Sequence, residues 1–406
     1  MPLSEYVQRI QPSSTMAIEA KAKQMQRDGI DVISLAAGEP DFDTPEHIKE
    51  AGIKAIRDGH TKYTPAAGIP ELKEAILQRL AIDDGLAYGQ DQVIVNCGGK
   101  HTLYLAVAAL VSPGDEVIVP APYWVTSSEQ PKLVGGNTVI VETTEEDGLK
   151  LTAQRFSEAI TPRTKIVVIN SPSNPSGAVY SRQELEALAE VAVEHGIHIL
   201  SDEIYDRLTY DGVEHVSIAS LNEQVKELTV IVKGVSKSYA MTGWRVGYAV
   251  GSSEVIAGMI KAQMQILSHT SSISQHAAVT ALTGPQGCVE EMRQEYDRRR
   301  RRIVEGFNQI EGIRCPMPKG AFYAYPDISA HFASTRPNGG ARINDGPGLC
   351  SYLLDEARVA CVPGIGFGTH AHMRVSYATS MEKIDEALSR IGSAVKKLGS
   401  APTKRV

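Results

Sequence analysis

Residues 165–208, KIVVINSPSNPSGAVYSRQELEALAEVAVEHGIHILSDEIYDRL, decide the fold class. Two short apolar runs, KIVVIN (165–170) and HILSDE (198–203), flank a turn and a segment with helical patterning over Arg182–His195. Three similar runs occur elsewhere: QVIVN (92–96), DEVIVP (115–120) and LTVIVKG (228–234). A second helical pattern, over Lys100–Val111, follows the first of them. Short, fully apolar strands separated by helices are typical of a parallel sheet covered on both faces. The sequence therefore predicts an α/β fold with a mainly parallel sheet between layers of helices.

Such sheets bind ligands in the crevice beyond the carboxyl ends of their strands. Four segments follow directly on the predicted strands and should line that crevice: 98–100, 170–177, 201–205 and 234–237.

The pattern changes after about residue 290, where long polar helices alternate with short strand-like runs, among them GAFYAYP (320–326) and MRVSYA (373–378). We expect a large domain over 46–290 and a smaller α+β domain formed by 1–45 together with 291–406. In this interpretation the N-terminal segment folds back onto the C-terminal part.

Composition excludes several classes of protein. The 406 residues carry a net charge of −7, which does not favour a nucleic-acid partner. The arginine run 298–302 follows acidic residues in a helical pattern and is interpreted as a solvated helix face. The start of the chain has no signal-like apolar core, and no apolar run reaches the roughly 20 residues that a membrane span needs. Five scattered cysteines without a CxxC motif indicate reduced thiols, so we expect a cytoplasmic protein.

Lys237 is the first candidate for chemistry, in GVSKSYAMTGWRVGY (234–248). A lysine directly after an apolar strand should lie in the crevice, where loss of water lowers its pKa and makes its amine a nucleophile. Arg245 follows at a place where its planar fork could bind a phosphate. An arbitrary lysine is usually an ordinary surface residue, but small neighbours and a strand end count against that here.

Asp202 ends another predicted strand, in SDEIYDRL (201–208). A buried carboxylate is costly without a partner, and the N–H of a cationic heterocycle is such a partner. Tyr205 would then reach an oxygen on the same ring. An aspartate that caps the next helix is the plainer explanation of this motif.

Two glycine- and proline-rich turns complete the set. NSPSNPSGAVY (170–180) would hold the Asn174 amide rigidly, although a plain turn explains it equally well. Gly98 and Gly99 lie between a strand and a helix, where free backbone N–H groups can bind phosphate, but a GG pair alone is weak support. The histidines lack metal-ligand spacing, so no metal site is expected, and there is no GxSxG motif of a serine hydrolase.

Eight ordered segments together resemble the class I aminotransferases of pyridoxal-phosphate (PLP) fold type I, and most of all the bacterial aspartate aminotransferases. They span nearly the whole chain: 34–48, 62–76, 113–125, 170–180, 201–208, 236–248, 318–326 and 373–380.

The resemblance implies roles for individual residues. Lys237 would hold PLP as a Schiff base (the internal aldimine), Asp202 would pair with the ring nitrogen, and Asn174 and Tyr205 would bind the ring oxygen. Trp124 would stack on the ring, although a buried core tryptophan is equally compatible with the sequence. The phosphate would be bound by the backbone of Gly99 and Lys100, by Arg245, and by Tyr63 of a second subunit, which implies a homodimer with shared sites.

For the substrate, the resemblance implies that Arg374 binds the α-carboxylate, assisted by the Gly38 backbone and Asn174, with Trp124 alongside. Lys100, Ser14 and Thr15 are the candidates for contact with a distal carboxylate. One departure concerns Gly234, which stands where several relatives carry a phosphate-binding serine. Ser236 is the candidate substitute.

The implied reaction is a ping-pong transfer between amino acids and 2-oxo acids, through an aldimine and pyridoxamine phosphate. L-Aspartate and 2-oxoglutarate, giving oxaloacetate and L-glutamate, are the leading substrates. An aromatic or prephenate aminotransferase is the main alternative, and a PLP β-lyase or a ligand-sensing regulator shares the fold. A regulator would need a DNA-binding domain, for which residues 1–31 are too few.

Overall fold

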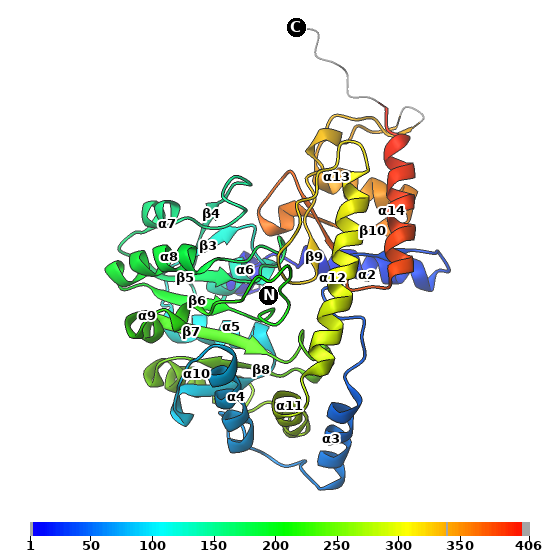
Figure 1. Ribbon diagram of the computed structural model, residues 1–406. Coiled ribbons are helices and arrows are strands. Elements are labelled where there is room, and N and C mark those ends of the chain that lie inside the picture. Colours follow the sequence, from blue (N-terminus) through cyan, green and yellow to red (C-terminus); the bar gives the residue numbers. More distant parts are fainter. Residues whose placement is uncertain (1–2, 338–339, 400–406) are drawn as a thin grey trace.

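The computed structural model describes residues 3–337 and 340–399. Its largest sheet has seven strands in the order β2-β8-β7-β6-β5-β3-β4 (Figure 1). The strands are β2 (Val93–Asn96), β3 (Glu116–Ala121), β4 (Asn137–Glu142), β5 (Thr164–Asn170), β6 (His198–Asp202), β7 (Thr229–Gly234) and β8 (Gly247–Val250). All neighbours are parallel except β8, which runs antiparallel to both β2 and β7. The predicted α/β class with a mainly parallel sheet is confirmed.

Alternating side chains of each central strand pack on the two opposite faces of the sheet. Val117 and Val119 of β3 pack with α5 (Gly99–Leu110) and α10 (Ser253–Ile266) on one face. Ile118, between them, packs with α8 (Arg182–His195) on the other. This alternation is the period-2 pattern of a strand, and here both faces are covered by apolar helix surfaces.

Other helices complete these layers. The second face also carries α7 (Ala153–Ala159) and α9 (Glu223–Leu228). Near β2 and β8 lie α3 (Glu46–Arg57), α4 (Pro70–Asp83) and α11 (Ser272–Thr283), and α6 (Val125–Leu133) connects β3 to β4.

A second core surrounds α12 (Gly287–Asn308) and α14 (Met381–Lys396), which pack along each other (Figure 1). It includes a three-stranded antiparallel sheet of β11 (Val362–Pro363), β12 (Met373–Ser376) and β9 (Tyr323–Ala324). This core thus combines long helices with a short sheet that is separate from the seven-stranded one. The short elements α13 (Gly346–Tyr352) and β10 (Val359–Ala360) lie in the chain between β9 and β11.

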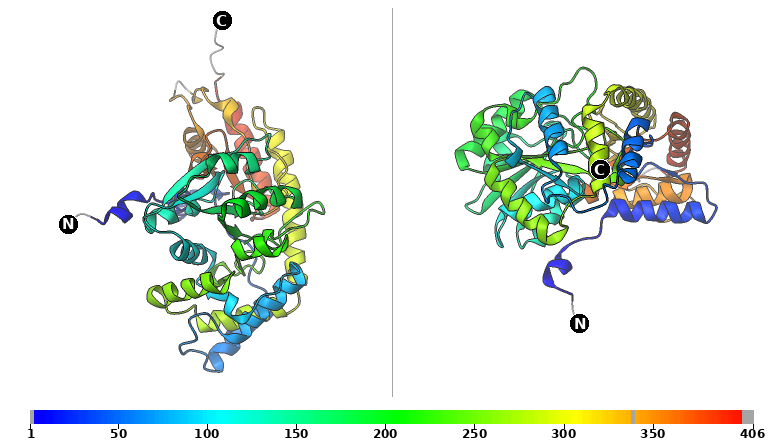
Figure 2. Two further views of the ribbon diagram at one scale, coloured as in Figure 1. Left: turned by 90° about the vertical axis from the view of Figure 1, so that its left-hand side faces the viewer. Right: turned by 90° about the horizontal axis from the view of Figure 1, so that it is seen from below.

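The N-terminal segment contacts the elements around this second core. Strand β1 (Ile33–Ser34) pairs in parallel with β10, and α2 (Ser14–Arg27) contacts β10 and β11. Helix α1 (Glu5–Arg9) lies at one side of the molecule, has no buried residue and contacts α6 (Figure 2). No helix among the described residues is long and apolar enough to cross a membrane.

The interpretation of residues 298–302 as a solvated helix face is wrong for two of the five arginines. Arg300 is fully buried and binds Asp211 and Asp297, while Arg299 is 6% exposed and binds Asp41. The reason is that α12 is covered on more than one side, so a charged side chain that turns inward must meet a carboxylate. Arg298, Arg301 and Arg302 are the solvated ones.

Candidate active site

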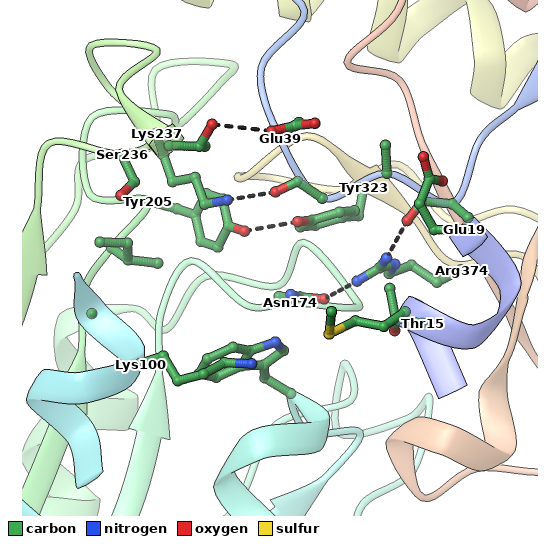
Figure 3. Close-up of a pocket in the computed structure, with 18 of the residues that line it drawn as sticks. Thr15, Glu19, Glu39, Lys100, Asn174, Tyr205, Ser236, Lys237, Tyr323 and Arg374 are labelled. Atoms are coloured by element: carbon green, nitrogen blue, oxygen red, sulfur yellow. Dashed lines mark hydrogen bonds between the residues drawn. The ribbon is translucent and has the colours of Figure 1, made fainter. Parts of the chain in front are cut away.

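The carboxyl ends of β5, β6 and β7 open into a cavity of about 550 Å³ (Figure 3). Eleven side chains and turns proposed from sequence line it: Thr15, Gly38, Gly99, Lys100, Trp124, Asn174, Asp202, Tyr205, Ser236, Lys237 and Arg245, joined by Arg374 from β12. The two cores therefore meet around one cavity, and residues more than 350 positions apart in sequence face each other across it.

Lys237 lies three residues beyond β7, and its Nζ donates a hydrogen bond to the carbonyl oxygen of Gly38 (Figure 3). Burial lowers the pKa of Lys237 to about 8, against the opposing attraction of Glu39, and the positive charge of Arg374 lowers it further. The lowered pKa makes the uncharged amine, which is the form that attacks a carbonyl, more abundant near neutral pH than in an ordinary lysine.

Asp202 is the last residue of β6 and is 4% exposed. Among the described residues, its carboxylate accepts one hydrogen bond, from the Ile204 N–H at 3.4 Å. Burial raises the pKa of Asp202 to about 7, and neighbouring Glu203 adds to the rise. A buried carboxyl that faces a cavity with so little compensation fits a ligand that brings a cationic N–H.

Arg374 is 2% exposed, and its two terminal nitrogens are already held. Nη1 donates to Asn174 Oδ1 at 3.0 Å and Nη2 donates to the Ala36 carbonyl at 2.7 Å (Figure 3). Asn174 is itself positioned because its N–H donates to Asn170 Oδ1 at 2.7 Å. The buried Nε of Arg374 has no partner within the described chain, so the guanidinium retains capacity for an added carboxylate.

Tyr205, from the segment after β6, and Tyr323 of β9 are linked by a hydrogen bond between their hydroxyls, 2.8 Å long (Figure 3). Both rings are buried, and burial raises the pKa of Tyr205 well above its usual 10, so its hydroxyl keeps its proton. It is thus a donor that could turn from Tyr323 to an oxygen in the cavity.

The opposite wall has the geometry of an anion site. Gly98 adopts φ +78° and α5 begins at Gly99, so the first N–H groups of a 12-residue helix are directed at the cavity. Arg245 stands against this turn: a Cβ on Gly98 would lie 2.4 Å from its Nη2. The glycine is needed both for its conformation and for this close approach.

The same close packing explains the departure at Gly234. A Cβ there would lie 3.0 Å from the Val246 carbonyl oxygen and 3.1 Å from the Gly247 Cα. A serine would have to push β7 and β8 apart on this backbone. Ser236, two residues on, lines the cavity instead.

Of three further proposed residues, Lys100 lines the cavity and Ser14 and Tyr63 do not. Lys100 Nζ lies 5.1 Å from the centre of the Trp124 ring, and burial together with Arg245 lowers the pKa of Lys100. Ser14 does not line the cavity: its hydroxyl is buried beside Gly366, where a Cβ would lie 2.2 Å from Oγ. Tyr63 is 92% exposed and also lies outside the cavity of the single chain.

Sequence reasoning missed several cavity residues, and Tyr323 and Glu39 are two of them. Glu39 accepts a hydrogen bond from the Thr242 hydroxyl at 3.0 Å and so links the N-terminal segment to the loop after Lys237. Both lie inside segments that carry the resemblance to the aminotransferases, 34–48 and 318–326. Their place in these segments was the signal that could have identified them.

Comparison with known proteins gives the same answer as the cavity. Residues 30–391 match the family model described as aminotransferase class I and II. The chain belongs to the class I and II aminotransferases. An aspartate aminotransferase of Geobacillus stearothermophilus is 49% identical over 96% of this aminotransferase and 98% of that protein. An aspartate/prephenate aminotransferase of Cereibacter sphaeroides is 47% identical, over 96% and 97%. The crystal structure of a Rhizobium meliloti aspartate aminotransferase superposes with a TM-score of 0.95 at 44% identity, covering 98% of this chain and all of that one.

The aminotransferase depends on PLP, as its family does, and the cavity fits that cofactor. A lysine amine, a buried carboxyl short of partners, and a helix N-terminus beside an arginine correspond to the aldehyde, the ring nitrogen and the phosphate. The fit rests on the buried Asp202 carboxylate, which has few hydrogen-bond partners in the protein alone, and on N–H groups that are free to bind an anion.

One consequence of this fit is measurable without cofactor. Because the pKa of Asp202 rises on folding from 3.8 to about 7, the folded protein binds more protons than the unfolded chain in that interval, and stability falls as pH rises through it. We expect cofactor-free Asp202→Asn to be more stable than cofactor-free wild type at pH 8, with the difference shrinking towards pH 4. Urea unfolding at a series of pH values measures this. A difference that stays constant with pH would show that Asp202 is not desolvated.

Proposed function

We propose that this aminotransferase exchanges the amino group between L-aspartate and 2-oxoglutarate, giving oxaloacetate and L-glutamate. The observation that carries the proposal is a second cation, Lys100, on the cavity wall in addition to the buried Arg374. A dicarboxylic substrate needs two such cations, because a buried unpaired carboxylate costs several kcal/mol. The names of the relatives from Geobacillus stearothermophilus and Rhizobium meliloti support this choice.

The chain's own groups have distinct tasks in the reaction. Bound PLP supplies a carbonyl that takes up the substrate amine and a ring that withdraws electrons from its Cα. Asp202 would hold the proton on the ring nitrogen, which is what keeps the ring electron-withdrawing. Tyr205 and Asn174 would donate to the ring oxygen, and the α5 N-terminus with Ser236 and Arg245 would bind the phosphate.

Arg374 binds the α-carboxylate and thereby orients the substrate. With the carboxylate fixed at one side of the cavity, the Cα–H bond is presented to Lys237. The Lys237 amine, with its lowered pKa, then takes the proton from the substrate Cα as a base. As an acid it would deliver that proton to the carbon that was the carbonyl carbon of PLP, so that the amino group stays with the cofactor.

Replacement of the second cation tests the substrate. We expect Lys100→Ala to raise KM for aspartate and 2-oxoglutarate about ten- to hundredfold, corresponding to about 1.5–3 kcal/mol for a charged hydrogen bond. KM for phenylalanine should change little, because it has no distal carboxylate. Steady-state kinetics with both amino acids measure the effect.

Lys261→Ala, on an exposed turn of α10, is the matched control and should leave both constants unchanged. Equal losses for aspartate and phenylalanine in Lys100→Ala would assign Lys100 to the cofactor or the fold and remove the main local support for aspartate.

An aromatic or prephenate aminotransferase is the second candidate. The relative from Cereibacter sphaeroides is named for both aspartate and prephenate. The apolar side chains of Met16 and Ile204 and the rings of Trp124 and Tyr323 also line the cavity, and these surfaces suit a ring-bearing substrate. A side chain that carries both a ring and a carboxylate would use these surfaces and Lys100 together.

We further infer a homodimer whose sites are completed by Tyr63 of the second subunit. The support is that Tyr63 is 92% exposed, with its ring perpendicular to that of His269, so most of its surface is open to a neighbour. We expect a dimer by light scattering at assay concentrations, and Tyr63→Phe should weaken PLP binding about tenfold, the value of one hydrogen bond to a charged group. A monomer with full activity would contradict this.

Two broader inferences accompany these. The separate hydrophobic cores support a large body of residues 46–290 and a smaller body of 1–45 with 291–406, with α12 crossing between them. The five free cysteines support a reducing compartment, and we propose the cytoplasm.

A further inference from the structure

A buried network of charges lies directly behind the cavity and has no part in the mechanism above. Lys233 is 3% exposed, and its Nζ lies 2.6 Å from Asp84, 2.9 Å from Asp206 and 3.3 Å from Glu203. Glu203 is 1% exposed and accepts further hydrogen bonds from Ser201, Ser217 and His215 at 2.8–3.0 Å.

The arrangement of Asp84, Glu203 and His215 resembles a cation site, since one ligand atom from each lies within 4.8 Å of the others. Lys233 Nζ already contacts two of the three and supplies the positive charge. The network is therefore self-contained, and its importance lies in what it is attached to.

Three members of the network, Glu203, Asp206 and Lys233, lie within four residues of a residue that lines the cavity. Glu203 directly follows Asp202, Asp206 directly follows Tyr205, and Lys233 is four residues before Lys237. Consecutive residues at the end of a strand point to opposite sides, so Asp202 faces the cavity while Glu203 faces the network. The N–H of Glu203 also donates to the Val232 carbonyl at 2.9 Å, which continues the β6–β7 pairing to this level.

The charges do not balance. One ammonium contacts three carboxylates, and phenols and His215 lie around it. Arg207 adds a second positive charge that attracts Asp206, but it pairs with Asp83, so the network keeps an excess of negative charge. Tyr88, Tyr239 and Tyr248 approach from three other elements, and burial raises the pKa of each hydroxyl. Burial also raises the pKa of Asp84, to about 6, with Lys233 opposing, whereas Lys233 and His215 keep Glu203 ionised.

We propose that Lys233, Glu203, Asp206 and Asp84 form a positioning network for transamination. The ion pairs hold the ends of β6 and β7 together, so that Asp202 and Lys237 face one cofactor. Its excess negative charge, centred on Glu203, strengthens the hold of Asp202 on a proton, and in the loaded enzyme that proton is the one shared with the ring nitrogen.

The residues of the network lie outside the cavity, so they act by positioning Asp202 and Lys237, and their charge acts through Asp202. This inference rests on the proposed role of Asp202, but it does not depend on which amino acid is the substrate.

The test measures the protonation of Asp202 in the cofactor-free protein by infrared difference spectroscopy over a range of pH. For the wild type and for each network variant, the reference spectrum is that of the same protein with Asp202→Asn added. Glu203→Gln keeps the shape of the side chain and removes its charge. We expect the protonation midpoint of Asp202 to fall by about one pH unit, the lower end of the effect of a nearby charge. In the loaded enzyme, the aspartate half-reaction should slow about tenfold, which is the same free energy.

Glu116→Gln is the matched control. Glu116 is also a buried carboxylate at a strand end, but it lies on β3, which carries none of the ionisable residues in the mechanism. Its partner is Arg163. Glu116→Gln should lower the melting temperature without moving the Asp202 midpoint. Asp84→Asn is a second, more distant variant, which should shift the midpoint in the same direction as Glu203→Gln but by less.

An unchanged Asp202 midpoint in whichever of Glu203→Gln and Asp84→Asn folds would overturn the proposal. Failure of both variants to fold would also overturn it, since the network would then serve the stability of the fold. Substrate preference in the half-reaction is read separately, so failure of this inference and failure of the aspartate assignment remain distinguishable.

Discussion

Lys237→Ala should lower turnover by at least about 10⁴-fold, the upper end of what a single acid–base group contributes. The same change should remove the visible absorbance of lysine-bound PLP. Both effects follow from one atom: Nζ is the amine at the carboxyl end of β7 whose pKa burial lowers to about 8, and it points into the cavity (Figure 3). Alanine leaves the phosphate and ring contacts intact, so we expect non-covalent cofactor binding to persist.

Chemical rescue separates catalysis from folding. A small primary amine added to Lys237→Ala should restore part of the proton transfer, because it can occupy the space that the side chain leaves. Lys261→Ala serves again as the control and should behave as wild type. Near-wild-type turnover of Lys237→Ala without added amine would show that another group is the base.

Asp202→Asn should leave the protein folded and slow the half-reaction on the order of 10³-fold, the cost of removing one preorganised electrostatic contact. An amide no longer favours a proton on the ring nitrogen, so the ring withdraws electrons less. Stopped-flow absorbance after mixing with aspartate measures the rate. Unchanged rates at full cofactor occupancy would remove Asp202 from the mechanism.

The same substitution is expected to stabilise the cofactor-free protein above pH 7. The opposite signs for stability and rate are informative, because they are what a carboxyl kept for function predicts: Asp202 costs stability in the empty protein and is compensated only by a cationic ligand.

The sequence was sufficient for the fold class and for most of the cavity. Apolar strands such as 165–170 and 198–203 identify a parallel sheet by themselves, and the strand-end rule then places Asn174, Asp202 and Lys237 together. The antiparallel strand β8 was not predicted, because GYAV (247–250) is only four residues long and pairing direction leaves no trace in such a run.

Features that depend on tertiary contacts could not be predicted. The burial of Arg299 and Arg300 requires knowing what covers α12, and the ion pairs of Lys233 bring together residues 149 and 27 positions apart. Similarly, the direction of the Ser14 hydroxyl, towards Gly366 and not the cavity, depends on the exact rotation of α2 against the second core. Tyr63 can be placed fully only with a second chain.

The central claim is that this PLP-dependent aminotransferase binds dicarboxylic substrates through Arg374 and Lys100. A panel of single half-reactions tests it most directly: loss of the absorbance of lysine-bound PLP is followed with aspartate, glutamate, phenylalanine, arogenate and alanine. The account predicts the highest rate constant per unit concentration for aspartate and glutamate, with alanine far slower, and pyridoxamine phosphate with a 2-oxo acid as products. Equal rates for alanine and aspartate, or release of ammonia in place of pyridoxamine phosphate, would contradict it.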